Sequence, residues 1–170
     1  MIALIADNMQ ITTAHITDSV PIAELSRDDI EYGLPWSWTP KRIASCVGHE
    51  DFNVVVAKDG DLLAGFGIMQ YCDNGASLSL LAVSAACRRR AVGTRIVVWL
   101  EQVAINAGIF DIIVQLRERN TGAEAFYRQL AFEPLDRVER YYRNSEAALV
   151  MSKHLGQSAG LPTTSWQPTR

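Results

Sequence analysis

Residues 87–94 read CRRRAVGT, and the interpretation of the whole chain depends on this stretch. Three consecutive arginines precede a glycine and a threonine, directly before a segment with helical periodicity. The first N–H groups of a helix lack intrahelical acceptors, and the helix dipole favours anions there. Arginine adds charge-assisted hydrogen bonds to phosphate, and glycine lets a ligand approach the backbone closely. The stretch therefore suits a diphosphate, although a solvated corner before a helix is the plainer interpretation.

The segments on either side of this loop predict an α/β domain. Hairpin signals at Asp59-Gly60 and Asn74-Gly75 join three strands ahead of the loop, and a helical period of apolar side chains follows it. Strands are expected at 9–15, 53–58, 62–71, 76–83, 110–116, 131–142 and 146–154, and helices at 19–31, 40–48, 94–108 and 121–130. This order predicts one continuous sheet with helices packed on it.

Composition limits the classes of function. The 170 residues fit one domain, and the net charge of −3 lacks the basic excess of a typical duplex-binding domain. Three cysteines without CxxC spacing indicate neither a disulfide framework nor a zinc site. The first residues lack the basic start of a signal peptide, and no apolar run approaches the ~20 residues that span a membrane. We therefore expect a cytoplasmic protein with no metal, no membrane association and no nucleic-acid partner.

Two familiar phosphate-binding patterns, GxxxxGK(S/T) and GxGxxG, are absent from the sequence. Instead, the hexapeptide 88–93 resembles the pyrophosphate loop of the GNAT family of N-acetyltransferases, whose pattern is Arg/Gln-x-x-Gly-x-Gly/Ala. The resemblance continues through Arg117-x-x-Asn120-x-x-Ala123-x-x-x-Tyr127 and the segments 130–132, 141–142 and 146–148. That spacing is particularly similar to the ribosomal-protein N-terminal alanine acetyltransferases. The resemblance covers residues 50–155 well and the first 50 residues more loosely.

The resemblance implies an acetyltransferase domain over residues 1–155 with a mostly antiparallel mixed sheet of about six to seven strands, including a splayed pair, and about four helices on both faces. The Gly-, Ser-, Thr- and Pro-rich residues 156–170 are expected to form a flexible tail. The resemblance also implies acetyl-CoA as co-substrate. The expected cofactor-binding residues are Leu81, Ala82 and Val83 for the pantetheine arm, Arg88, Arg89, Arg90, Ala91, Val92, Gly93 and Thr94 for the pyrophosphate, and Asn120 for the arm.

The same resemblance places Tyr127 near the sulfur, as the general acid that protonates the leaving thiolate. A core tyrosine on the apolar face of its helix is the plainer interpretation of Tyr127, and a helix N-cap is the plainer interpretation of Asn120. The acidic segment 27–32, with Trp36 and Trp38, either lines an acceptor groove or packs as a charged helix end.

Three residues depart from the family pattern. Ala91 and Ala131 stand where glycine is usual, and a left-handed backbone at such a position costs an alanine about 1–2 kcal/mol. Gln115 stands where the related alanine acetyltransferases carry a glutamate proposed as general base, and an amide cannot take up a proton at neutral pH.

Three functions are therefore compared. The leading prediction is an acetyl-CoA-dependent N-acetyltransferase that acts on a primary amine, either a protein N-terminus or a small molecule. The alternative is a catalytically impaired CoA-binding module with a regulatory role. The third is a nucleic-acid contact through the arginine run, which the acidic pI of about 5.6 disfavours. A sheet edge or the C-terminal tail offers a surface for a homodimer.

Overall fold

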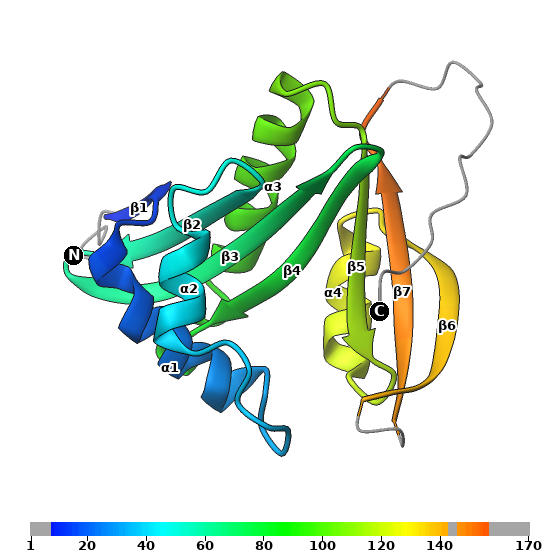
Figure 1. Ribbon diagram of the computed structural model, residues 1–170, viewed down its shortest axis with the longest axis horizontal. Helices are drawn as coiled ribbons and strands as arrows, with labels where there is room; N and C mark the ends of the chain where they lie inside the picture. The colour runs from blue at the N-terminus through cyan, green and yellow to red at the C-terminus, as the bar shows by residue number, and fades with distance from the viewer. Residues whose placement is uncertain (1–7, 143–145, 157–170) are drawn as a thin grey trace, which may run out of the picture. The chain divides into compact units, whose positions relative to one another are not determined.

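Seven strands pair in the order β1-β2-β3-β4-β5-β7-β6 in one mixed sheet (Figure 1). The computed structural model describes residues 8–142 and 146–156. The strands are β1 (Met9–Thr13), β2 (Phe52–Asp59), β3 (Leu62–Cys72), β4 (Gly75–Val83), β5 (Asp111–Arg117), β6 (Glu133–Tyr142) and β7 (Glu146–His154). The helices are α1 (Ser19–Asp29), α2 (Pro40–Cys46), α3 (Val92–Asn106) and α4 (Thr121–Gln129), with short 3-10 turns at Ile16–Asp18 and Ala85–Cys87.

This arrangement confirms the predicted α/β fold, and every expected strand and helix is present with small differences at the ends. Local signals placed several of these ends correctly. Thr39 caps α2 by accepting a hydrogen bond from the Arg42 N–H, and Pro40 occupies the first helical turn. The predicted C-terminal tail falls almost entirely on residues 157–170, which lie outside the described residues.

The chain gathers into two compact units, and β3, β4 and α3 are each divided between them. The first unit contains residues up to Ile68 together with Leu80–Leu100, and the second contains Met69–Ser79 and the residues from Glu101 onward. The first unit therefore carries the arginine loop, and the second carries α4.

In the first unit, helices cover both faces of the sheet, as Figure 1 shows. Side chains of α1 and α2 share one buried cluster with alternate residues of the strands, namely Val54, Val56, Phe66, Ile68, Leu80 and Ala82. On the opposite face, β3 has glycines where α3 crosses it. A Cβ on Gly67 would lie 2.7 Å from Ile96 Cγ2, and a Cβ on Gly65 would lie 2.8 Å from the Ala82 carbonyl oxygen. These glycines let α3 pack closely on the strand.

In the second unit, β5 pairs antiparallel with β7 along its whole length, from Asp111↔His154 to Arg117↔Ala148. β6 forms the edge and pairs with β7 through a register with two irregularities. The parallel register between β4 and β5 ends at Leu78↔Val114, although β4 continues to Val83. Within the first unit, the residues of β4 from Leu80 to Val83 neighbour β3 alone, so the other edge of this part of β4 has no strand partner in that unit.

Candidate active site

The arginine loop begins at Arg88, after the 3-10 turn Ala85–Cys87, and leads into α3. Arg89 and Ala91 both adopt left-handed backbone conformations, with φ of 62° and 56°. Alternation of left-handed with ordinary residues turns successive N–H groups toward one point and forms an anion-binding concavity. The first hydrogen bond of α3 runs from the Arg95 N–H to the Ala91 carbonyl. The N–H groups of Val92, Gly93 and Thr94 therefore have no acceptor within the helix.

β4 brings a second set of backbone groups to the start of this loop. The Ser84 N–H donates to the Ala64 carbonyl of β3 at 2.8 Å. Because alternate residues of a strand direct their N–H and C=O groups to opposite sides, Ala82 also faces β3, whereas Leu81 and Val83 face away from it. Of the three residues predicted to contact a pantetheine arm, Leu81 and Val83 thus offer backbone groups on the open side. The backbone of Ala82 is turned toward β3.

Two of the three arginines in the loop are paired with carboxylates from distant parts of the first unit. Arg88 Nη2 lies 3.0 Å from Asp29 Oδ2, and Arg90 Nη1 lies 3.0 Å from Asp59 Oδ2. Arg89 has no ion pair with any residue that the structure describes, so its guanidinium is the one of the three left for a phosphate. Sequence reasoning missed both carboxylates, because 59 and 31 residues separate the partners and no local pattern joins them.

Ala91 provides a direct test of the loop conformation. Left-handed backbone costs an alanine about 1–2 kcal/mol, and glycine adopts it without a Cβ penalty. After subtraction of the extra entropy of glycine in the unfolded chain, we expect Ala91→Gly to raise the free energy of unfolding by about 1 kcal/mol, or Tm by about 2–4 °C. Ala86→Gly, at an exposed residue of the preceding turn without positive φ, should not raise Tm. An Ala91→Gly protein less stable than the parent would contradict the left-handed assignment.

Asn120 caps α4, as one of its two predicted roles requires. Its Oδ1 accepts a hydrogen bond from the Ala123 N–H at 3.0 Å, and its backbone ψ of 69° is non-helical, as is usual for a cap residue. Since the oxygen is used by the cap, only the Nδ2 amide remains to donate to a ligand. The side chain is exposed, so capping and ligand contact are compatible.

Tyr127 is buried on α4, with 6% of its surface exposed. Its ring packs edge-on against Phe126 and Phe132, with centroids 5.2 and 5.3 Å apart. Burial raises the pKa of Tyr127 well above its ordinary value near 10, because the phenolate loses its hydration. The hydroxyl forms no hydrogen bond with another described residue and stays protonated at neutral pH. This state is the one that a proton donor needs.

The end of α4 fixes the aromatic partner of Tyr127. Ala131 adopts a left-handed φ of 65°, and the Phe132 N–H donates to the Tyr127 carbonyl at 3.0 Å. This is the hydrogen bond of a Schellman C-cap, in which glycine is the usual left-handed residue. The glycine-to-alanine departure at Ala131 therefore lies at a structural position, as expected.

Gln115 lies on β5, and its Oε1 accepts a hydrogen bond from the Tyr141 hydroxyl at 2.6 Å. The hydrogen bond fixes the amide with its oxygen toward Tyr141 and its NH₂ group available as a donor. On the neighbouring residue of β6, burial raises the pKa of Tyr142 to about 12. Gln115 itself cannot accept a proton.

The carboxylates of Asp28 and Glu31, in the acidic segment 27–32, already have partners in their own surroundings. Glu31 is buried, and its carboxylate accepts hydrogen bonds from the Ser37 N–H and hydroxyl and from the Trp38 N–H. Asp28 pairs with Arg27, whose guanidinium also lies over the Trp36 ring. These contacts favour the interpretation of a packed helix end over that of a groove that attracts an ammonium group.

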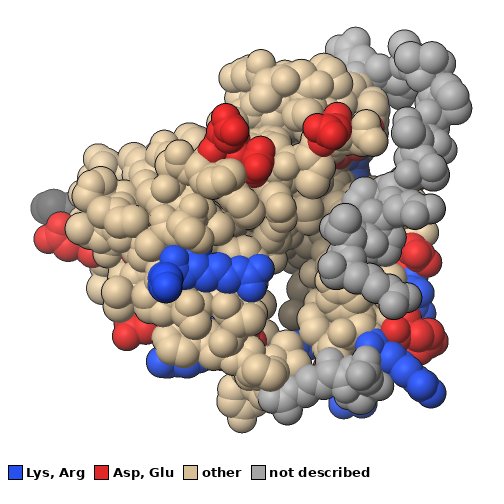
Figure 2. Space-filling model, viewed as in Figure 1, with Lys and Arg blue, Asp and Glu red and all other residues tan. Residues whose placement is uncertain are grey.

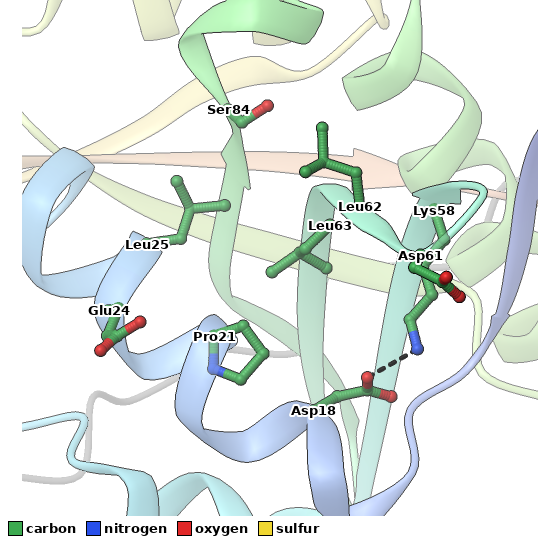
Figure 3. A pocket seen from close by; sticks show the side chains of 9 residues that line it. All are labelled: Asp18, Pro21, Glu24, Leu25, Lys58, Asp61, Leu62, Leu63 and Ser84. Carbon is green, nitrogen blue, oxygen red and sulfur yellow. Dashed lines mark ion pairs between the residues drawn. The ribbon is translucent and has the colours of Figure 1, made fainter.

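The first unit also contains a cavity of about 350 Å³ between α1 and the hairpin of β2 and β3 (Figure 3). Across it, Asp18 Oδ1 meets Lys58 Nζ at 2.6 Å, as Figure 3 shows. None of the predicted cofactor-binding residues lines this cavity, so it does not mark the predicted cofactor site.

Among the described residues, no group of three His, Cys, Asp or Glu side chains is placed to hold a metal ion. No helix within 8–142 or 146–156 is long and apolar enough to cross a membrane.

The predicted site residues fall into two sets. Leu81–Val83 and Arg88–Thr94 lie together in the first unit, where β4 ends and α3 begins. Asn120 and Tyr127 lie on α4 in the second unit.

Solved structures share this fold over nearly their whole lengths. The ribosomal-protein-S18-alanine N-acetyltransferase from Escherichia coli is 23% identical, with a TM-score of 0.74, and the match covers 92% of this chain and 99% of that one. Ard1 from Thermoplasma volcanium is 19% identical, with a TM-score of 0.78 and coverage of 88% and 99%. The PaiA N-acetyltransferase from Thermoplasma acidophilum, solved with coenzyme A, is 17% identical, with a TM-score of 0.73 and coverage of 86% and 98%.

Among curated proteins, none matches this sequence. The model of the acetyltransferase (GNAT) family matches residues 20–132, which is more than half of the chain. This span includes the arginine loop, β4, Asn120 and Tyr127. The chain belongs to the GNAT family of acetyltransferases.

Proposed function

We propose that the protein transfers an acetyl group from acetyl-CoA to a primary amine by direct attack of the neutral amine. The observation that carries this proposal is the open edge of β4, which runs into a loop with left-handed residues, unpaired helix N–H groups and Arg89. A ligand with an extended arm and a diphosphate matches this arrangement. The arm would lie along the edge of β4, and the diphosphate would lie in the anion-binding loop that follows.

The residues present fit such a cofactor. The N–H and C=O groups of Leu81 and the N–H of Val83 face the open side of β4 and would bind the amide-containing arm as an added strand does, whereas the Val83 carbonyl already accepts a hydrogen bond from Arg88. The N–H groups of Val92, Gly93 and Thr94, with the Arg89 guanidinium, would hold the pyrophosphate. Ala91 is an exposed residue of this loop.

Two groups would act on the reaction. Bound acetyl-CoA supplies an activated thioester. The Val83 N–H, free on the open side of β4, would donate a hydrogen bond to the carbonyl oxygen as negative charge develops there. Tyr127 would donate its hydroxyl proton to the departing sulfur. The hydroxyl carries its proton at neutral pH, as this role requires.

The acceptor class follows from Gln115. With an amide hydrogen-bonded to Tyr141 in place of a carboxylate, this position offers no base. An amine that is already partly neutral at physiological pH is therefore favoured, such as a protein N-terminus with pKa ~7.7–8.0 or a small amine of low pKa. The identity of the acceptor, the cytoplasmic location and the homodimer stay predictions.

Gln115→Glu should restore a base at this position. At pH 6.5 an α-amine is mostly protonated, so we expect kcat/KM for it to rise about tenfold, whereas at pH 9 the change should stay within about twofold. Gln102→Glu makes the same substitution at an exposed position of α3 and should leave both values unchanged. Equal changes at the two pH values would show that Gln115 does not face the reacting amine.

Neither competing function gains support from the structure. In Figure 2 the lysine and arginine side chains on the face in view occur in separate groups, unlike the continuous basic area that a nucleic acid requires. The direct test is release of the CoA thiol from acetyl-CoA in the presence of a panel of amines. Saturable binding of acetyl-CoA without release for any amine would support the inactive module.

A further inference from the structure

Asp29 is the last residue of α1, and this is an unfavourable place for a carboxylate. The carbonyl end of a helix carries partial negative charge, which repels an acidic side chain and favours a basic one. The Asp29 side chain nevertheless has only 25% of its surface exposed, and its carboxylate contacts Arg88. Its partner comes from the arginine loop, 59 residues away in the sequence. The helix end thus holds a carboxylate whose contact is with the loop.

Arg88 uses two nitrogens at once. Its Nη2 contacts Asp29 Oδ2 at 3.0 Å, and its Nε donates to the Val83 carbonyl at 3.3 Å. The planar guanidinium therefore bridges the end of α1 and the end of β4, and the carboxylate on one side sets its orientation toward the carbonyl on the other.

Together with a hydrogen bond to β3, the contact of Arg88 with Val83 fixes the orientation of one peptide group. The carbonyl of Val83 is held by Arg88, and the N–H of the same peptide, that of Ser84, is held by the Ala64 carbonyl at 2.8 Å. This peptide marks the point where β4 ends and the segment that leads to the loop begins. Its orientation determines the direction in which the chain leaves the strand, next to the residue whose N–H is proposed to face the thioester.

We propose that Asp29 is a positioning residue for cofactor binding, which acts through Arg88 on the peptide between Val83 and Ser84. The proposal rests on the function proposed above. Arg88 then serves mainly to brace the loop, and Arg89 is the arginine whose side chain meets phosphate. The Arg90–Asp59 pair joins the loop to the end of β2.

Asp29→Asn should raise the KM and the Kd for acetyl-CoA about five- to tenfold, with kcat within about twofold. Tm should not fall, because the substitution also removes an unfavourable charge from the helix end. Asp29→Glu keeps the carboxylate and should restore KM to within about twofold of the parent. Asp28→Asn is the matched control: it removes the same charge one residue earlier, where the partner is Arg27, and should leave KM unchanged.

The pair itself is tested by a double-mutant cycle. Lysine lacks the two separate nitrogens in one fixed plane that Arg88 places on Asp29 and Val83, so Arg88→Lys should reproduce the effect of Asp29→Asn. The double variant should bind acetyl-CoA no more weakly than either single variant, because both substitutions break the same bridge. Additive losses, or a KM unchanged in Asp29→Asn, would overturn the proposal.

A measurement without cofactor separates this proposal from the proposed function. In Asp29→Asn, amide hydrogen exchange over residues 84–94 should be faster than in the parent and in Asp28→Asn. If the parent bound and turned over acetyl-CoA while exchange and KM stayed unchanged in Asp29→Asn, only the positioning role would fail. If the parent bound no acetyl-CoA, the proposed function and the cofactor role of Asp29 would fail together, whatever the exchange rates.

Discussion

Tyr127→Phe is expected to lower kcat by about 100- to 1,000-fold and to leave KM for acetyl-CoA within about twofold. The substitution removes only the hydroxyl. Phenylalanine keeps the edge-on contacts with Phe126 and Phe132, and no described residue loses a hydrogen bond. The loss therefore falls on proton donation to the departing thiolate rather than on packing.

Steady-state kinetics with a saturating amine measures this effect, and thermal unfolding checks the fold. Tyr71→Phe, which removes a hydroxyl from a half-buried tyrosine of β3 outside the proposed site, is the matched control and should retain the parental kcat. Because burial raises the pKa of Tyr127, the donor form persists as pH increases, and kcat should show no loss from this group below about pH 10. An unchanged kcat in Tyr127→Phe would remove Tyr127 from the mechanism.

The second large effect concerns the acceptor. At pH 7.4 an α-amine with pKa ~7.7–8.0 is about 20–30% neutral, whereas a lysine with pKa ~10.4 is about 0.1% neutral. Without a base at Gln115, acetylation of an α-amine should therefore exceed that of lysine by about 100- to 300-fold in kcat/KM. At pH 9.5 the lysine is about one-tenth neutral, and the ratio should fall to about ten.

Two peptides of the same sequence provide the comparison, one with a free N-terminus and its lysine blocked, the other with a blocked N-terminus and its lysine free. Mass spectrometry identifies the acetylated position. A peptide with both amines blocked controls for hydrolysis of the thioester. Robust acetylation of lysine without acetylation of the α-amine would show that another group deprotonates the acceptor, or that the site binds a lysine side chain selectively.

Local signals explain why much of the fold could be predicted from the sequence. Thr39 and Asn120 act as helix caps over three residues of chain, and the Asp59-Gly60 turn joins neighbouring strands. Such features depend on a few consecutive side chains and can be read directly from their order. The arginine loop was placed correctly for the same reason, between a strand and a helix.

The contacts of the site that the sequence did not reveal are tertiary. Arginine and alanine rarely adopt a left-handed backbone conformation, so the residue types at positions 89 and 91 do not predict the positive φ angles found there. The Arg88–Asp29 pair joins segments 59 residues apart, and only the packing of α1 on the sheet brings them together. The acidic segment 27–32 suggested an ammonium groove because its hydrogen-bond donors, such as Ser37, are not evident from spacing.

Calorimetric titration of the protein with acetyl-CoA tests the central claim most directly. The account predicts saturable binding with one molecule per chain, and at about 100 times Kd a stabilisation near 2.7 kcal/mol that appears as a higher Tm. Such a result would show that the chain binds the cofactor despite the alanine at position 91. Absence of binding at millimolar acetyl-CoA would contradict the claim, and Tyr127 would then be a core tyrosine without a role in acetyl transfer.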